Sequence, residues 1–214
     1  MISIAERHAI EKAFVASARG IFCDAGAGNL EVLRAVERSE GLIPVAVIDP
    51  RTLLDPGRTA RELVERGFKC FRVFPDHQGW PLDSRVLRAA LKELNETAPG
   101  ALFLLPVNDL RDFSEIGRLA GEAPGLNLVV CGVNSSFRPM FAEAVALVKD
   151  LANVYLETHR FDTADAFEVF REALGGVGEL GVGSDHPGEQ LPGPGQVTGP
   201  LVEVGQRVPH PHVV

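Results

Sequence analysis

The chain alternates between short segments of successive apolar residues and longer segments in which apolar residues recur every three or four positions. The short segments are rich in Val, Leu, Ile and Phe, which is typical of strands buried on both faces of a parallel sheet. They predict seven strands, at residues 12–17, 43–49, 69–75, 101–106, 127–132, 153–159 and 179–185.

The longer segments predict helices with recognisable ends. In residues 55–67, Asp55 is the expected N-cap, Pro56 the first helical residue and Gly67 the stop. Residues 83–95, 138–153 and 163–176 show the same apolar spacing. In residues 83–95 the apolar stripe consists of Val86, Leu87, Ala90, Leu91 and Leu94. Successive predicted strands begin 26 to 32 residues apart, which suits consecutive right-handed strand–helix–strand units of about 30 residues.

Seven strands of this kind fit either an open doubly wound sheet or most of a closed (β/α)8 barrel. A nucleotide-binding doubly wound sheet usually has a glycine-rich phosphate loop after its first strand. This chain offers only Gly26 and Gly28 there, so we interpret these glycines and Asn29 as loop and cap residues. Even spacing favours an α/β fold of the (β/α)8 TIM-barrel type, incomplete because a full barrel needs about 250 residues. We expect the barrel in residues 1–187 and a Pro/Gly-rich tail in residues 188–214, where residues 200–204 could add an edge strand.

The composition limits the kinds of binding partner and the compartment that we expect for this chain. The net charge is −8 and no cluster of Lys and Arg occurs, which argues against nucleic-acid and membrane-surface binding. Cys23, Cys70 and Cys131 lie far apart without a CxxC pair, as expected in a reducing compartment. No signal-peptide pattern and no apolar run near the ~20 residues of a membrane span is present. We therefore expect a soluble cytoplasmic protein with a small-molecule ligand.

Candidate chemistry gathers where the predicted strands end, which is where parallel α/β folds place their active sites. His77, His159 and His186 follow three of these ends, and Asp185 closes the last one. Asp185 is either a metal ligand or general base, or a cap of the following turn. His159, next to Arg160, is a base, an anion clamp or a paired surface histidine. Alternation along a strand would not aim Asp185 and His186 at the same pocket.

Two further side chains have open alternatives. Trp80 either lines a pocket or fixes its loop onto the next helix, and we favour the second role. Arg72 lies inside a predicted apolar strand, so its guanidinium needs a carboxylate or a ligand anion as partner. Arg72 is accordingly a structural ion-pair residue or a substrate clamp. Cys131 is expected to be a small core hydrophobe.

Four segments, GFKCFRVFPDHQGWPLDS, LNLVVCGVNSSF, NVYLETHRFDT and GVGSDHP, occur in this order along the chain. In them the sequence resembles the amidohydrolase 2 branch of the amidohydrolase superfamily, metal-dependent TIM-barrel hydrolases and decarboxylases related to aminocarboxymuconate semialdehyde decarboxylase. The resemblance covers Ala5 to about Pro187. The sequence lacks the family's first-strand His-x-His pair. Where the family has a histidine at the end of its fifth strand, this chain has Pro106 or Asn108, and where the family has one at the end of its sixth strand, this chain has Gly132. Asp185 matches the family's acidic residue, which binds metal or shuttles a proton.

The resemblance implies a metal-dependent hydrolase or decarboxylase acting on a small carboxylate or cyclic amide. In that case Asp185 and His159 are catalytic, and these two with His186 hold a divalent metal, most simply zinc. The expected substrate contacts are His77, Trp80, Asn108 and Arg160. The missing ligands favour a second hypothesis, in which a degenerate, metal-free barrel binds a small molecule or serves as an assembly module. A missing first unit would also uncover apolar surface, so we expect a homo-oligomer, most simply a dimer.

Overall fold

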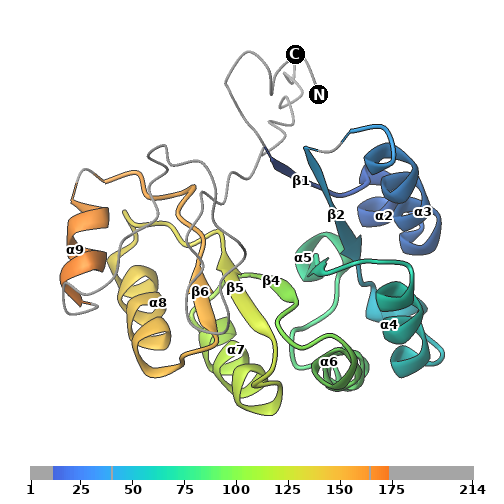
Figure 1. Cartoon of the computed structure of the whole chain (residues 1–214). Helices are drawn as coiled ribbons and strands as arrows, with labels where there is room; N and C mark the ends of the chain where they lie inside the picture. The colour runs from blue at the N-terminus through green and yellow to red at the C-terminus, as the bar shows by residue number, and fades with distance from the viewer. Residues whose placement is uncertain (1–11, 40, 164, 174–214) are drawn as a thin grey trace, which may run out of the picture.

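The computed structural model describes residues 12–39, 41–163 and 165–173, which form a curved parallel sheet with helices on its outer side (Figure 1). Six strands lie in chain order, and each pairs in parallel with the next. They are β1 (Ala13–Val15), β2 (Leu42–Val47), β3 (Cys70–Arg72), β4 (Leu102–Pro106), β5 (Asn127–Cys131) and β6 (Val154–Leu156).

One or more helices connect each strand to the next, as parallel pairing requires. They are α2 (Ala18–Phe22), α3 (Ala25–Val36), the 3₁₀ turn η1 (Pro50–Thr52), α4 (Pro56–Glu65), α5 (Pro75–Gln78), α6 (Arg85–Thr97), α7 (Arg111–Glu122) and α8 (Arg138–Asp150). Helix α9 (Ala166–Ala173) follows β6. Within this part of the chain no helix is both long and apolar enough to cross a membrane.

The strand order decides between the two predicted architectures. A doubly wound sheet reverses its strand order part-way, whereas the six strands here follow one another without reversal. The fold is therefore an incomplete (β/α)8-type barrel, and the predicted fold class is confirmed. The predicted seventh strand and the Pro/Gly-rich tail lie outside the described residues.

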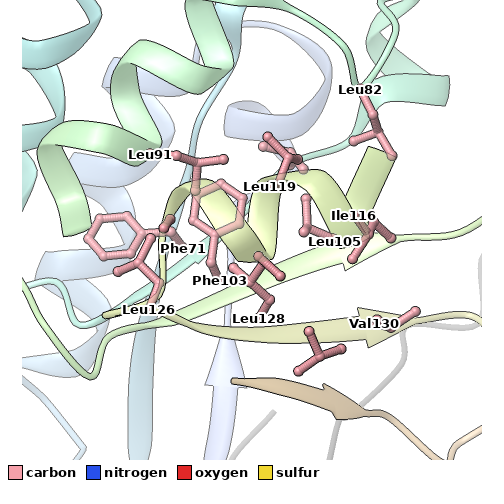
Figure 2. Close-up of a cluster of buried hydrophobic side chains, with 14 of the residues drawn as sticks. Phe71, Leu82, Leu91, Phe103, Leu105, Ile116, Leu119, Leu126, Leu128 and Val130 are labelled. Carbon is pink, nitrogen blue, oxygen red and sulfur yellow. The ribbon is translucent and has the colours of Figure 1, made fainter. Parts of the chain in front are cut away.

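Most of the core lies between the sheet and the helices. Phe71 and Phe103 stack with ring centroids 6.4 Å apart, and Figure 2 shows them directed toward Leu91 and Leu119 of the helical layer. The opposite, concave face carries a smaller apolar cluster of Val45, Cys70, Leu104, Val129 and Cys131. Cys131 is thus a core residue, as predicted. Alternate residues of each strand serve the two clusters, so both faces of the sheet are apolar.

The predicted helix ends are largely confirmed. The Asp55 carboxylate accepts a hydrogen bond from the Arg58 N–H at 3.0 Å, and Pro56 begins α4. Gly67 follows that helix with φ +95°, a conformation that favours glycine. Strands are shorter than predicted at several ends. In particular, β6 stops at Leu156, so His159 lies just beyond the strand.

The interpretation of Gly26, Gly28 and Asn29 as loop and cap residues is wrong, because all three lie inside α3. The N-cap is Asp24, which accepts from the Ala27 N–H at 2.9 Å. A Cβ added to Gly28 would lie 2.3 Å from the backbone N of Gly20 in α2. Gly28 is therefore needed where α2 and α3 cross, a contact that local sequence does not reveal.

Asn29, a residue of α3, makes side-chain hydrogen bonds to the backbone of strand β2. Its side chain is 4% exposed; Nδ2 donates to the Val47 carbonyl at 3.0 Å, and Oδ1 accepts from the Val47 N–H at 2.8 Å. Strand β1 pairs only with the first half of β2, up to Pro44. The Asn29 amide therefore takes the place of a strand residue beside Val47.

Replacing this amide should destabilise the fold. Asn29→Ala leaves the buried N–H and C=O of Val47 without partners, which should lower the free energy of unfolding by about 2 to 4 kcal/mol. Urea unfolding followed by circular dichroism measures the change. Leu30→Ala, at an exposed position of the same helix, is the control and should change stability by no more than about 0.5 kcal/mol. Equal effects of the two substitutions would contradict this role of Asn29.

Candidate functional site

Polar side chains replace apolar ones at the carboxyl ends of β3 and β6. On β3, Arg72 shares the concave face with Cys70, two residues before it. The hydrogen bonding between β5 and β6 continues one residue past the end of β6, because the Glu157 N–H donates to the Val130 carbonyl at 2.9 Å. Glu157 follows Tyr155 of the concave cluster by two residues. The structure thus places a cation and a carboxylate at the strand ends of one face.

Glu157 and His159 form a pair in contact. Glu157 is 6% exposed, and its Oε2 accepts from the Gly132 N–H at 3.2 Å. Its Oε1 contacts Nδ1 of His159, whose side chain is partly exposed. The Gly132 N–H, directly after β5, thus fixes the Glu157 carboxylate, and this carboxylate in turn contacts the His159 imidazole. The second ring nitrogen of His159, Nε2, lies across the imidazole from the nitrogen that contacts Glu157.

The surroundings lower the pKa of the His159 imidazole. Burial lowers the pKa of the His159 imidazole below its ordinary value of 6.5, and the Arg160 and Arg72 cations lower it further. A neutral ring with its Nδ1 proton on the Glu157 side can accept a proton at Nε2. The Arg72 guanidinium carbon lies 5.1 Å from the centroid of the Phe74 ring, in a cation–π contact. An arginine, a histidine and the carboxylate that contacts the histidine therefore lie at these two strand ends.

Two predicted substrate contacts lie around α5. His77 is exposed, with its ring centroid 5.6 Å from that of Phe22 and 6.1 Å from that of Phe74. Trp80 is buried in the main core, and its Nε1 donates to Oε1 of Gln78 at 2.9 Å. This packing agrees with fixation of the loop onto the fold. A substrate contact stays a prediction for both residues.

The other predicted site residues are distributed unevenly. Arg160 is exposed beside His159. Asn108 is exposed after β4, and its N–H donates to Oδ2 of Asp112 at 2.9 Å. Asp185 and His186 lie outside the residues that the structure describes. Of the predicted side chains, the structure therefore brings His159 into contact with the Glu157 carboxylate, and the roles of His159 and Arg160 stay predictions.

The sequence interpretation missed Glu157. It stood within the predicted strand at residues 153–159 without a role of its own. The available signal was its spacing, because residues two apart on a strand face the same side. A carboxylate two positions before a histidine at the end of a buried strand indicates an oriented imidazole.

The fit to a metal is partial. Across residues 12–39, 41–163 and 165–173 no group of three or more His, Cys, Asp or Glu side chains could hold a metal ion. Catalytic zinc usually has three protein ligands. Metal-bound histidines commonly donate their second ring N–H to a carboxylate, as His159 is placed to do toward Glu157. The described residues thus fit one ligand of such a site.

Comparison with known proteins supports the fold. No family model and no curated protein matches the sequence. The structure is similar to the crystal structure of an amidohydrolase from Burkholderia multivorans with bound HEPES, at a TM-score of 0.54 and 13% sequence identity. The match covers 81% of this chain and 66% of that one. At this identity the similarity concerns the fold alone, and the finer branch expected from sequence stays a prediction.

The lowered pKa of His159 predicts a pH dependence of stability. Its folded pKa lies below the unfolded value, so its contribution is fully present above about pH 6.5 and is lost as pH falls through the folded pKa. Urea unfolding between about pH 7.5 and pH 5 should show a decline that is shallower in His159→Asn. His77→Asn, which removes a histidine from α5, is the control. An unchanged slope in His159→Asn would contradict the lowered pKa of His159.

Proposed function

We propose that this chain is an amidohydrolase-type hydrolase whose reaction centre lies at the carboxyl ends of β3 and β6. The observation that carries the proposal is the Glu157–His159 pair, an imidazole with a lowered pKa in contact with a buried carboxylate. The amidohydrolase of similar fold supports the same placement, because barrel enzymes work at this end of the sheet.

His159 would act as general base and then general acid. Its Nε2 takes a proton from a water whose oxygen attacks the substrate carbonyl carbon, and Glu157 stabilises the resulting imidazolium. The imidazolium then returns the proton to the leaving nitrogen as the C–N bond breaks. Water adds across the bond, and His159 ends neutral, so the cycle closes without another reactant.

The charges at the site favour an anionic substrate. Arg72 and Arg160 both lie close enough to His159 to lower its pKa. Cations this near to His159 would attract a substrate carboxylate and would stabilise the oxyanion that forms at the substrate carbonyl. We therefore propose a small carboxylate or a cyclic amide as substrate, with His77, Trp80 and Asn108 as further contacts.

A divalent metal, most simply zinc, is part of the proposal. Bound near His159, it would supply an activated water and polarise the carbonyl. His159, Asp185 and His186 are the residues proposed to hold it. A His159 whose Nε2 binds the metal could not serve as the base, and Asp185, the other proposed catalytic residue, would then take the proton. The homodimer and the cytoplasmic location expected from the sequence stay predictions.

The first test is the metal content of the purified full chain, followed by a substrate panel. Elemental analysis should find close to one zinc or similar ion per chain, and this metal should be lost in Asp185→Asn. The panel contains cyclic amides and N-acyl amino acids for hydrolysis, with CO₂ release measured to detect decarboxylation. A metal content far below one per chain that zinc addition does not restore would exclude the metal from the proposal.

The second test concerns the Glu157–His159 pair. His159→Asn removes the base and should lower kcat on any turned-over substrate by roughly 10²- to 10⁴-fold. Glu157→Gln should lower kcat by a smaller factor, because the imidazole remains but loses its orienting charge. Glu168→Gln, an exposed carboxylate on α9, is the matched control and should leave kcat unchanged. An active His159→Asn variant would exclude His159 as the base.

A further inference from the structure

The loop after β5 is tied to the loop after β6 through one buried serine. Ser135 is 0% exposed, and its Oγ donates to Oδ1 of Asp162 at 2.7 Å. The same oxygen lies 2.9 Å from the Asp162 N, 3.2 Å from the Thr163 N and 3.2 Å from the Thr163 Oγ1, all of which are donors. One hydroxyl group therefore accepts hydrogen bonds from the backbone N–H groups of residues 162 and 163.

The backbone of the β5 loop adds two contacts that reach closer to the site. The Ser135 N–H donates to the carbonyl of Arg160 at 3.3 Å. The Ser136 N–H donates to Oδ1 of Asp162 at 3.1 Å. Three residues before Ser135, the Gly132 N–H holds Glu157. The β5 loop thus contacts the chain on both sides of His159.

We propose that Ser135 is a positioning residue for His159: its hydroxyl fixes residues 160–163, while Gly132 fixes Glu157, so that the imidazole is held between two anchored points. The catalytic consequence of this positioning rests on the proposed function. The positioning itself follows from the contacts and does not require a substrate or a metal.

The anchor works at neutral pH because Asp162 is ionised there. Hydrogen bonds from Ser135, and then from Ser136, lower the pKa of the Asp162 carboxyl below its ordinary value. An ionised carboxylate accepts from the hydroxyl and the amide together, in charge-assisted bonds that are shorter and stronger than neutral ones. A buried polar network whose members are all satisfied rigidifies the segments that it joins.

The test uses the full chain and two matched serine variants. Ser135→Ala removes the buried hydroxyl, whereas Ser136→Ala changes the neighbouring exposed residue and keeps its N–H. Asp162→Ala breaks the same network at an exposed position, so it provides the answer if Ser135→Ala does not fold. Asn29→Ala serves as a variant destabilised far from the loop.

Two measurements decide the outcome. Hydrogen exchange of the amides of residues 158–163 should accelerate roughly tenfold in Ser135→Ala and Asp162→Ala, as local opening becomes easier. Carbethoxylation of His159 by diethyl pyrocarbonate, taken relative to His77 of the same molecule, should change by a similar factor. Both measurements are made as purified and after chelator treatment, so that a metal on His159 cannot hide the effect.

The proposal is overturned if Ser135→Ala and Asp162→Ala lower stability but leave the His159-to-His77 reactivity ratio as in Ser136→Ala and Asn29→Ala. Ser135 would then be a structural residue only. Failure of the proposed function looks different: His159→Asn would leave turnover or metal content unaffected while the ratio still changes in Ser135→Ala.

Discussion

Burial of both faces of the parallel sheet is the constraint on which the rest of this structure depends. Each strand residue must serve either the helical layer or the concave face, and neither environment tolerates an unpaired polar group. The apolar clusters on the two sides show how completely the strands meet this requirement. Polar side chains are therefore confined to the strand ends, where Arg72, Glu157 and His159 lie. The position of the candidate site is thus a consequence of how the sheet is buried.

Much of the fold could be predicted from sequence because its signals are local. Continuous apolar segments located the six described strands, and the Asp55–Pro56 pair located the start of a helix within a residue. Strand ends were less accurate, since composition does not show where pairing stops. The contact of Gly28 with Gly20 and the bond of Asn29 to Val47 were missed because each joins segments that pattern analysis treats separately.

The site was predictable in its place but not in its members. His159 and Arg160 were predicted as site residues from their position after an apolar segment, and their roles stay predictions. Glu157 was missed because its partners, the Gly132 N–H and the His159 ring, are brought to it by the neighbouring strand and the following turn. Ser135 was missed for a stronger reason. No sequence pattern indicates that this serine is buried, and its hydrogen-bond partner Asp162 lies 27 residues away along the chain.

The Asn29 amide also has a consequence for how the sheet can open. Val47 is satisfied by a side chain of α3, while β1 is joined to β2 only over Ala13 to Val15. Detachment of β1 would therefore expose the first half of β2 and leave the Val47 pairing intact. Loss of β1 alone would thus leave in place the hydrogen bonds that join β2 to α3 and to β3.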